Sequence, residues 1–215
     1  MVVVCQADKD DPEGQSVFLL EDHRRDLEFQ TAGESLGMRM IPVERVSFNL
    51  AQVFEKDLIG EEGKGSFYLK ECLRALRVKA GAMALGIAQG AFDRALDYAL
   101  KREQFGKAIV SFNPVKNRLA DMFTRVETAR QMVYRAAWAL AQERPDERAS
   151  IMAKMIAART ALSVASDAIQ IYGGYGYMTE GQVEHFYRDA KALNIFLESG
   201  PVEENMLGDL ITWRL

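Results

Sequence analysis

The chain has 215 residues, of which 48% are hydrophobic, and its formal net charge is −4 at pH 7. This length and composition are typical of a soluble globular chain that can bury a core, and the interspersed charges form no basic stripe for nucleic acid. The apolar runs are too short for a membrane span, and Met1–Val4 lacks the basic flank of a signal peptide.

The first part of the chain, residues 1–58, has the composition of a small sheet. Short runs rich in β-branched and aromatic residues alternate with glycine and proline, which predicts strands joined by turns. The runs are Val2–Cys5, Val17–Leu20, Leu27–Thr31 and Val43–Phe48. We therefore expect a partial antiparallel β-domain over residues 1–58.

From residue 59 onward the hydrophobic period changes to that of helices. Apolar residues recur every three to four positions in three long segments, which predicts amphipathic helices. The segments extend from about Ser66 to Arg102, from about Pro114 to Leu140 and from about Ile151 to Ile169, and shorter helices follow over about Gly181–Lys191 and from near Pro201. The predicted fold is mainly α, with an up-and-down four-helix-type bundle over residues 59–215.

Two motifs fall where long helical patterns end. Arg102–Lys107 places a cation beside an aromatic residue, and Gln170–Tyr177 contains a glycine pair that lets backbone amides approach a ligand. Such features suit a dinucleotide. Both motifs also have an interpretation that needs no ligand. The helix dipole favours a cation such as Arg102 in the last turn of a helix, and the glycines would serve as a helix C-cap.

Metal and hydrolase sites are not predicted. A di-iron bundle needs paired Glu-x-x-His motifs, and neither His23 nor His185 completes one. The same two histidines do not allow a Ser/His/Asp set to be assembled. Cys5 and Cys72 lack the CxxC spacing of a zinc site.

Together with the following Tyr187–Lys191, the two motifs resemble the C-terminal half of the acyl-CoA dehydrogenase family of FAD flavoproteins, and the resemblance covers nearly the whole chain. It implies that residues 1–58 are the end of the family's middle β-domain and that residues 59–215 are its C-terminal helical domain. Family members open with a helical domain and a strand that hold the flavin ring, and this chain starts after both. The resemblance implies a location in the cytoplasm or the mitochondrial matrix. Arg188 and Asp189 are interpreted as a structural ion pair.

The resemblance also implies roles for individual residues. Arg102 would contact the FAD pyrophosphate, with Gln104 and Phe105 packed on the cofactor, and Asn113 stands where the family usually has Gln. Gln170, Gly173 and Gly174 would bind the adenine and pyrophosphate half of the FAD that is held mainly by the neighbouring subunit. Leu73 and Arg77 would line the acyl-CoA site.

The family's chemistry removes a proton α to a thioester carbonyl, so it needs a carboxylate base. Counting along the motif puts Leu197 at the usual glutamate position, and Leu76 at the position that some members use instead. A slide of one residue would bring Glu198 into place, and we expect Glu198 to be the base. The alternative is a solvated loop carboxylate near the start of the last helix, favoured there by the dipole.

The implied activity is FAD-dependent α,β-dehydrogenation of an acyl-CoA thioester, with electrons passed to an electron-transferring flavoprotein. We also expect a homotetramer, because the three long helices offer more apolar face than one bundle needs. One alternative is a non-catalytic subunit that supplies the oligomer core and part of the FAD site to a separate N-terminal-half polypeptide. Another is a truncated product that binds neither ligand.

Overall fold

The computed structural model describes residues 1–6, 14–21, 23–144 and 146–212. The chain is mainly helical, with pairs of short antiparallel strands before the first long helix, which confirms the predicted fold class. It divides into two compact units. The first comprises Met1–Ser35 and Arg39–Leu73, and the second comprises Leu36–Met38 and Arg74–Leu215.

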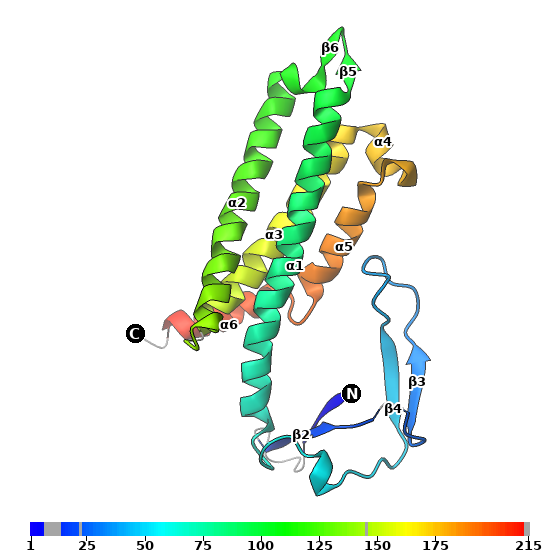
Figure 1. Cartoon of the computed structure of the whole chain (residues 1–215), viewed down its shortest axis with the longest axis vertical. Helices are drawn as coiled ribbons and strands as arrows, with labels where there is room; N and C mark the ends of the chain where they lie inside the picture. The colour runs from blue at the N-terminus through cyan, green and yellow to red at the C-terminus, as the bar shows by residue number, and fades with distance from the viewer. Residues whose placement is uncertain (7–13, 22, 145, 213–215) are drawn as a thin grey trace. The chain divides into compact units, whose positions relative to one another are not determined.

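The described part of the first unit contains two antiparallel strand pairs, of which β2, β3 and β4 are labelled in Figure 1. Strand β1 (Val2–Gln6) pairs with β2 (Gln15–Leu19), and β3 (Leu27–Thr31) pairs with β4 (Glu44–Phe48), both antiparallel. A 3-10 turn, Glu55–Asp57, precedes the first long helix. Each predicted strand is present, because the β-branched and aromatic runs favour extended backbone between the glycine and proline turns.

The second unit is a bundle in which α1, α2, α3 and α5 run alternately up and down (Figure 1). These helices are α1 (Gly65–Lys101, of which the part from Arg74 belongs to this unit), α2 (Asn113–Ala141), α3 (Glu147–Tyr172) and α5 (Glu184–Ile195). Alanines dominate the buried faces of α1 and α3, whereas α2 contributes larger side chains such as Met122 and Val126. Small residues on two helices let the backbones approach closely, and the larger ones fill the remaining space.

Short elements close the two ends of the bundle. After α1, strands β5 (Glu103–Gln104) and β6 (Lys107–Ala108) form a hairpin, followed by a 3-10 turn over Ile109–Ser111. Both turn residues of the hairpin have positive φ, 54° at Phe105 and 77° at Gly106, as a type I′ turn requires. This hairpin was not predicted from the sequence.

Beyond α3, the chain forms the single-turn helix α4 (Gly174–Tyr177), a 3-10 turn over Thr179–Gly181, and then α5 and α6. Helix α6 (Gly200–Thr212) packs against α3. Among the described helices, none has a stretch long and apolar enough to span a bilayer.

The segment Leu36–Met38 is held against α5. The Met38 amide donates to Asp189 Oδ1 at 2.6 Å, and Arg188 Nη1 donates to the Leu36 carbonyl at 3.0 Å. Arg188 also forms an ion pair with Glu184 at 3.1 Å. The prediction that Arg188 and Asp189 pair with each other is therefore wrong. Each side chain makes a structural contact with a different partner.

Candidate functional site

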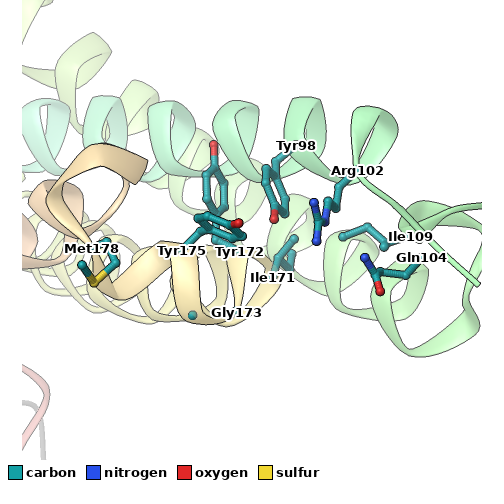
Figure 2. Close-up of a pocket in the computed structure, with 10 residues that line it drawn as sticks. Tyr98, Arg102, Gln104, Ile109, Ile171, Tyr172, Gly173, Tyr175 and Met178 are labelled. Atoms are coloured by element: carbon teal, nitrogen blue, oxygen red, sulfur yellow. The ribbon is translucent and has the colours of Figure 1, made fainter.

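A cavity of about 500 Å³ lies at one end of the bundle, where the ends of α1 and α3 meet the β5–β6 hairpin and α4 (Figure 2). Its lining combines aromatic rings with one cation. The lining residues are Tyr98, Arg102, Gln104, Ile109, Ile171, Tyr172, Gly173, Gly174, Tyr175 and Met178.

Arg102 directly follows the last residue of α1, and its backbone is fixed on both sides. Its amide donates to the Tyr98 carbonyl and its carbonyl accepts from the Ile109 amide, both at 2.8 Å. Figure 2 shows Tyr98 and Arg102 extending from α1 toward the end of α3. There the guanidinium lies 5.7 Å from the centre of the Tyr175 ring, within cation–π range, and the Tyr98 and Tyr172 rings stack 4.0 Å apart. The cation is thus placed among aromatic faces.

The glycine pair forms the opposite side of this cavity. Gly173 ends α3 with φ 62° and ψ −138°, and its amide donates to the Gln170 carbonyl at 3.2 Å. A Cβ added to Gly173 or Gly174 would meet no atom within 4 Å, so both residues face open space. A ligand could therefore approach this backbone closely.

Four of the seven predicted cofactor residues line the cavity: Arg102, Gln104, Gly173 and Gly174. The other three lie outside the lining. Gln170 is in the last turn of α3, Asn113 is the first residue of α2, and Phe105 is 92% exposed at the hairpin turn, with its ring edge-on to Phe112.

The sequence analysis did not single out Tyr98, although it precedes Arg102 by one helical turn and therefore shares its face. Ile109 and Met178 were missed as well, and Ile171, Tyr172 and Tyr175, which lie within the Gln170–Tyr177 motif, had been given no role of their own. The observed set fits a dinucleotide, since a guanidinium suits a diphosphate and aromatic faces suit a planar ring.

A second cluster lies around Arg77 on α1. Glu198 is in the loop between α5 and α6, and its Oε1 lies 2.7 Å from Arg77 Nη2 and 3.2 Å from Arg77 Nε. Glu147, the first residue of α3, lies 3.6 Å from Arg77 Nη1. The side chain of Arg77 is 3% exposed and that of Glu198 is 12% exposed. Glu198 is therefore not the solvated carboxylate of the alternative interpretation.

Leucines occupy the two usual base positions. The backbone of Leu197 has φ 64°, a left-handed conformation that is uncommon for a residue with a bulky side chain and that persists only where the surrounding structure determines it. Leu76 is half-buried on α1. Leu73, the other predicted substrate residue, is also half-buried on α1 and belongs to the first unit.

Two buried charged residues of this cluster were not predicted. Lys154 on α3 is fully buried, and its Nζ lies 2.6 Å from the Glu198 carbonyl oxygen and 3.0 Å from Glu203 Oε1 on α6. Burial raises the pKa of the Glu203 carboxyl, and the ion pair with Lys154 opposes this effect. The available signal was a lysine within the apolar stripe of α3, three residues after Ile151 and four before Ala158.

Within the described parts of the chain, no group of three histidine, cysteine, aspartate or glutamate side chains is arranged to hold a metal ion.

Comparisons with known proteins agree with this architecture. Residues 63–206 match the family described as "Acyl-CoA dehydrogenase, C-terminal domain". The chain is 39% identical over 198 residues to cyclohex-1-ene-1-carbonyl-CoA dehydrogenase of Syntrophus aciditrophicus, a match that covers 91% of this chain and 47% of that protein. The chain thus spans about half the length of the curated relatives that it matches.

Solved structures extend the similarity to the fold. Butyryl-CoA dehydrogenase from Megasphaera elsdenii superimposes with a TM-score of 0.95 at 32% identity, over 98% of this chain and 55% of the other. A chain from the structural study of the electron transferring flavoprotein of Acidaminococcus fermentans gives a TM-score of 0.95 at 34% identity, over 98% and 56%. The chain therefore belongs to the acyl-CoA dehydrogenase family.

Proposed function

We propose that the protein formed with this chain catalyses FAD-dependent α,β-dehydrogenation of an acyl-CoA thioester, with Glu198 as the catalytic base. The observation that carries the proposal is the placement of Glu198, whose carboxylate is mostly buried and directed by Arg77. A general base has to be held in a fixed direction toward the proton that it removes, and the contacts of Arg77 with Glu198 supply that constraint.

The two carboxylate oxygens of Glu198 are held differently. Oε1 accepts two contacts from Arg77, at 2.7 and 3.2 Å, whereas Oε2 is 3.4 Å from Arg77 Nε. Oε2 therefore has the greater remaining capacity to accept the α proton of the thioester. FAD, when bound, supplies the acceptor for the β hydrogen, which leaves with its electron pair. The substrate thus loses one proton and one hydride.

The cofactor end of the proposal rests on the cavity at the end of the bundle. We assign Arg102 to the diphosphate of FAD, and Gly173 and Gly174 to close backbone approach, because these groups line one open space. Gln104 lies in the same lining, and Phe105, Asn113 and Gln170 are assigned to FAD on the resemblance alone.

Arg77 and Leu73 are each assigned to the acyl-CoA substrate on the resemblance alone. We also assign residues 1–58 to the end of the family's middle β-domain and residues 59–215 to its C-terminal domain, an assignment that the family match over residues 63–206 supports.

The proposed partners are an electron-transferring flavoprotein, as electron acceptor, and further copies of the chain. The fold similarity to a chain from the study of such a flavoprotein supports the first. A homotetramer is supported by the large apolar side chains exposed on α2, which are Phe123, Tyr134 and Trp138. Light scattering tests the assembly, and a monodisperse monomer at micromolar concentration would exclude it.

The reaction is tested by anaerobic mixing of the FAD-loaded protein with a series of acyl-CoA thioesters. Glu198→Gln should slow flavin reduction at least about a hundredfold, the lower range for loss of a general base, without changing FAD content. The matched control is Glu204→Gln, which removes an exposed carboxylate from α6. A Glu198→Gln protein that reduces flavin at the parent rate would reject the assignment.

A parent protein whose flavin no acyl-CoA reduces would instead favour a non-catalytic role, in which the chain supplies the oligomer core and part of the FAD site. The observation that supports this second candidate is the presence of leucine at both usual base positions, Leu76 and Leu197.

A further inference from the structure

Lys154 is the largest fully buried side chain of the described structure, and it lies on the buried face of α3, in the N-terminal third of that helix. A lysine in such a position loses its hydration, which is costly unless its charge and its hydrogen bonds are satisfied by the protein. An apolar residue would fill the same space without that cost. The contacts of Lys154 should therefore explain what its ammonium group does.

Two of these contacts lead to the segment that carries Glu198. The Nζ atom lies 2.6 Å from the backbone carbonyl oxygen of Glu198, and 3.0 Å from Oε1 of Glu203 in the first turns of α6. One ammonium group on α3 thus holds the loop between α5 and α6 and also the helix that follows it. Glu203, which is 2% exposed, supplies the counter-charge that makes the buried lysine tolerable.

The backbone of this loop needs such support. Leu197 is in the left-handed region at φ 64°, and the backbone hydrogen bonds of the loop span at most four residues: the Glu198 amide donates to the Phe196 carbonyl at 2.9 Å, and the Ser199 carbonyl accepts from the amides of Val202 and Glu203 at 3.0 and 3.1 Å. A conformation of this kind persists only where the surroundings determine it. The bond from Lys154 reaches the very residue whose side chain is fixed by Arg77.

We propose that Lys154 is a positioning residue for Glu198. It fixes the backbone of Glu198 from α3 while Arg77 fixes the carboxylate from α1, and together they set where the base can take up a proton. This inference rests on the proposed function of Glu198 and adds a residue that acts through it.

The test removes the clamp without leaving a buried unpaired charge. Lys154→Met alone would strand Glu203, so the informative variant is Lys154→Met/Glu203→Leu, in which an ion pair is replaced by apolar side chains of similar volume. Such replacements are often neutral or stabilising, so the variant should fold with a Tm near that of the parent. The matched control is Arg159→Met, which breaks an exposed ion pair with Glu204 between the same two helices.

In the FAD-loaded protein, Lys154→Met/Glu203→Leu should lower the kcat for flavin reduction by about 10- to 100-fold, as expected when a catalytic group is misplaced by about 1 Å. The KM for acyl-CoA should change far less, because the substrate contacts remain. Amide hydrogen exchange at Glu198 should accelerate by about tenfold, since the loop loses a charge-assisted hydrogen bond. Arg159→Met should change none of these three quantities.

A double variant with the parent kcat, or with parent exchange at Glu198, overturns the positioning role. Glu198→Gln is measured in parallel to separate the two proposals. If Glu198→Gln is slow and the double variant is fast, only the inference about Lys154 fails. If Glu198→Gln is as fast as the parent, the base assignment fails and the positioning role fails with it.

Discussion

Arg77 and Glu198 are 121 residues apart in the sequence, yet Arg77 Nη2 lies 2.7 Å from Glu198 Oε1. This contact joins α1 to the loop before α6, and the guanidinium is also 3.6 Å from Glu147 on α3. A single buried cation therefore connects three segments of the bundle. Its removal would leave the Glu198 carboxylate, whose side chain is 12% exposed, without this partner.

Arg77→Met should lower the free energy of unfolding by about 3 to 5 kcal/mol, the usual cost of removing one partner of a buried ion pair. Urea unfolding followed by circular dichroism measures this. Arg135→Met is the control, because the exposed Arg135 is 4.0 Å from Asp146 and its loss should cost about 0.5 kcal/mol or less. Equal midpoints for Arg77→Met and the parent would show that the buried pair does not stabilise the fold.

The raised pKa of Glu203 predicts a specific pH dependence of stability. Below the ordinary pKa of glutamate, both folded and unfolded states bind the proton. As the pH rises from that value toward the raised pKa of the folded state, the unfolded state releases its proton first, and the free energy of unfolding falls. The free energy of unfolding of the parent, minus that of Glu203→Gln, should therefore decrease as the pH rises through this interval.

Urea titrations at several pH values between about 4 and 7 would measure that difference. Glu204→Gln is the control for the loss of a carboxyl group from α6. If both variants show the same pH dependence relative to the parent, burial of Glu203 is not its cause.

The adjacent glycines at the end of α3 offer a matched pair of substitutions. Gly173 has φ 62° and ψ −138°, so Gly173→Ala should cost about 1 to 3 kcal/mol of stability through backbone strain, although its Cβ would meet no atom. Gly174→Ala has the same free space without positive φ, so its stability should be close to that of the parent. Thermal unfolding compares them, and equal losses of Tm in both variants would contradict the assignment of strain to Gly173.

The long helices and the strands before α1 could be predicted because each depends on local pattern. The stripes on α2 and α3 follow the helical period, and the observed ends of α1 and α3, Lys101 and Tyr172, lie within a few residues of the predicted ones. Because the two candidate motifs lie at these ends, the sequence also indicated where the cavity is. Phe105 and Asn113 lie outside the lining of this cavity. The hairpin after Arg102 turns the chain through residues with positive φ, which the sequence pattern did not show.

The cluster at Arg77 could be predicted only in part. Lys154 and Glu203 belong to different helices, and only tertiary packing brings their charges to 3.0 Å. An apolar stripe interrupted by lysine shows that something must neutralise the charge, but it does not identify the partner. The left-handed Leu197 is equally invisible in the sequence, because bulky residues rarely adopt that conformation.

Arg102 provides the most direct test of the cofactor site. Its guanidinium lines the cavity with the glycine pair and lies over Tyr175, so it can meet a diphosphate that approaches along the glycine backbone. Arg102→Ala should raise the Kd for FAD by about tenfold to a hundredfold, as for loss of a charge-assisted hydrogen bond. Fluorescence titration of the FAD-free protein measures this change.

Lys101→Ala is the matched control, since Lys101 is the preceding cation and forms an exposed ion pair with Asp97 on the same helix. Both substitutions remove one positive charge from the end of α1, so a general effect of the helix dipole or of net charge would weaken FAD binding equally in the two variants. A selective loss in Arg102→Ala would assign the contact to the guanidinium that lines the cavity. An unchanged Kd in Arg102→Ala would remove Arg102 from the cofactor site.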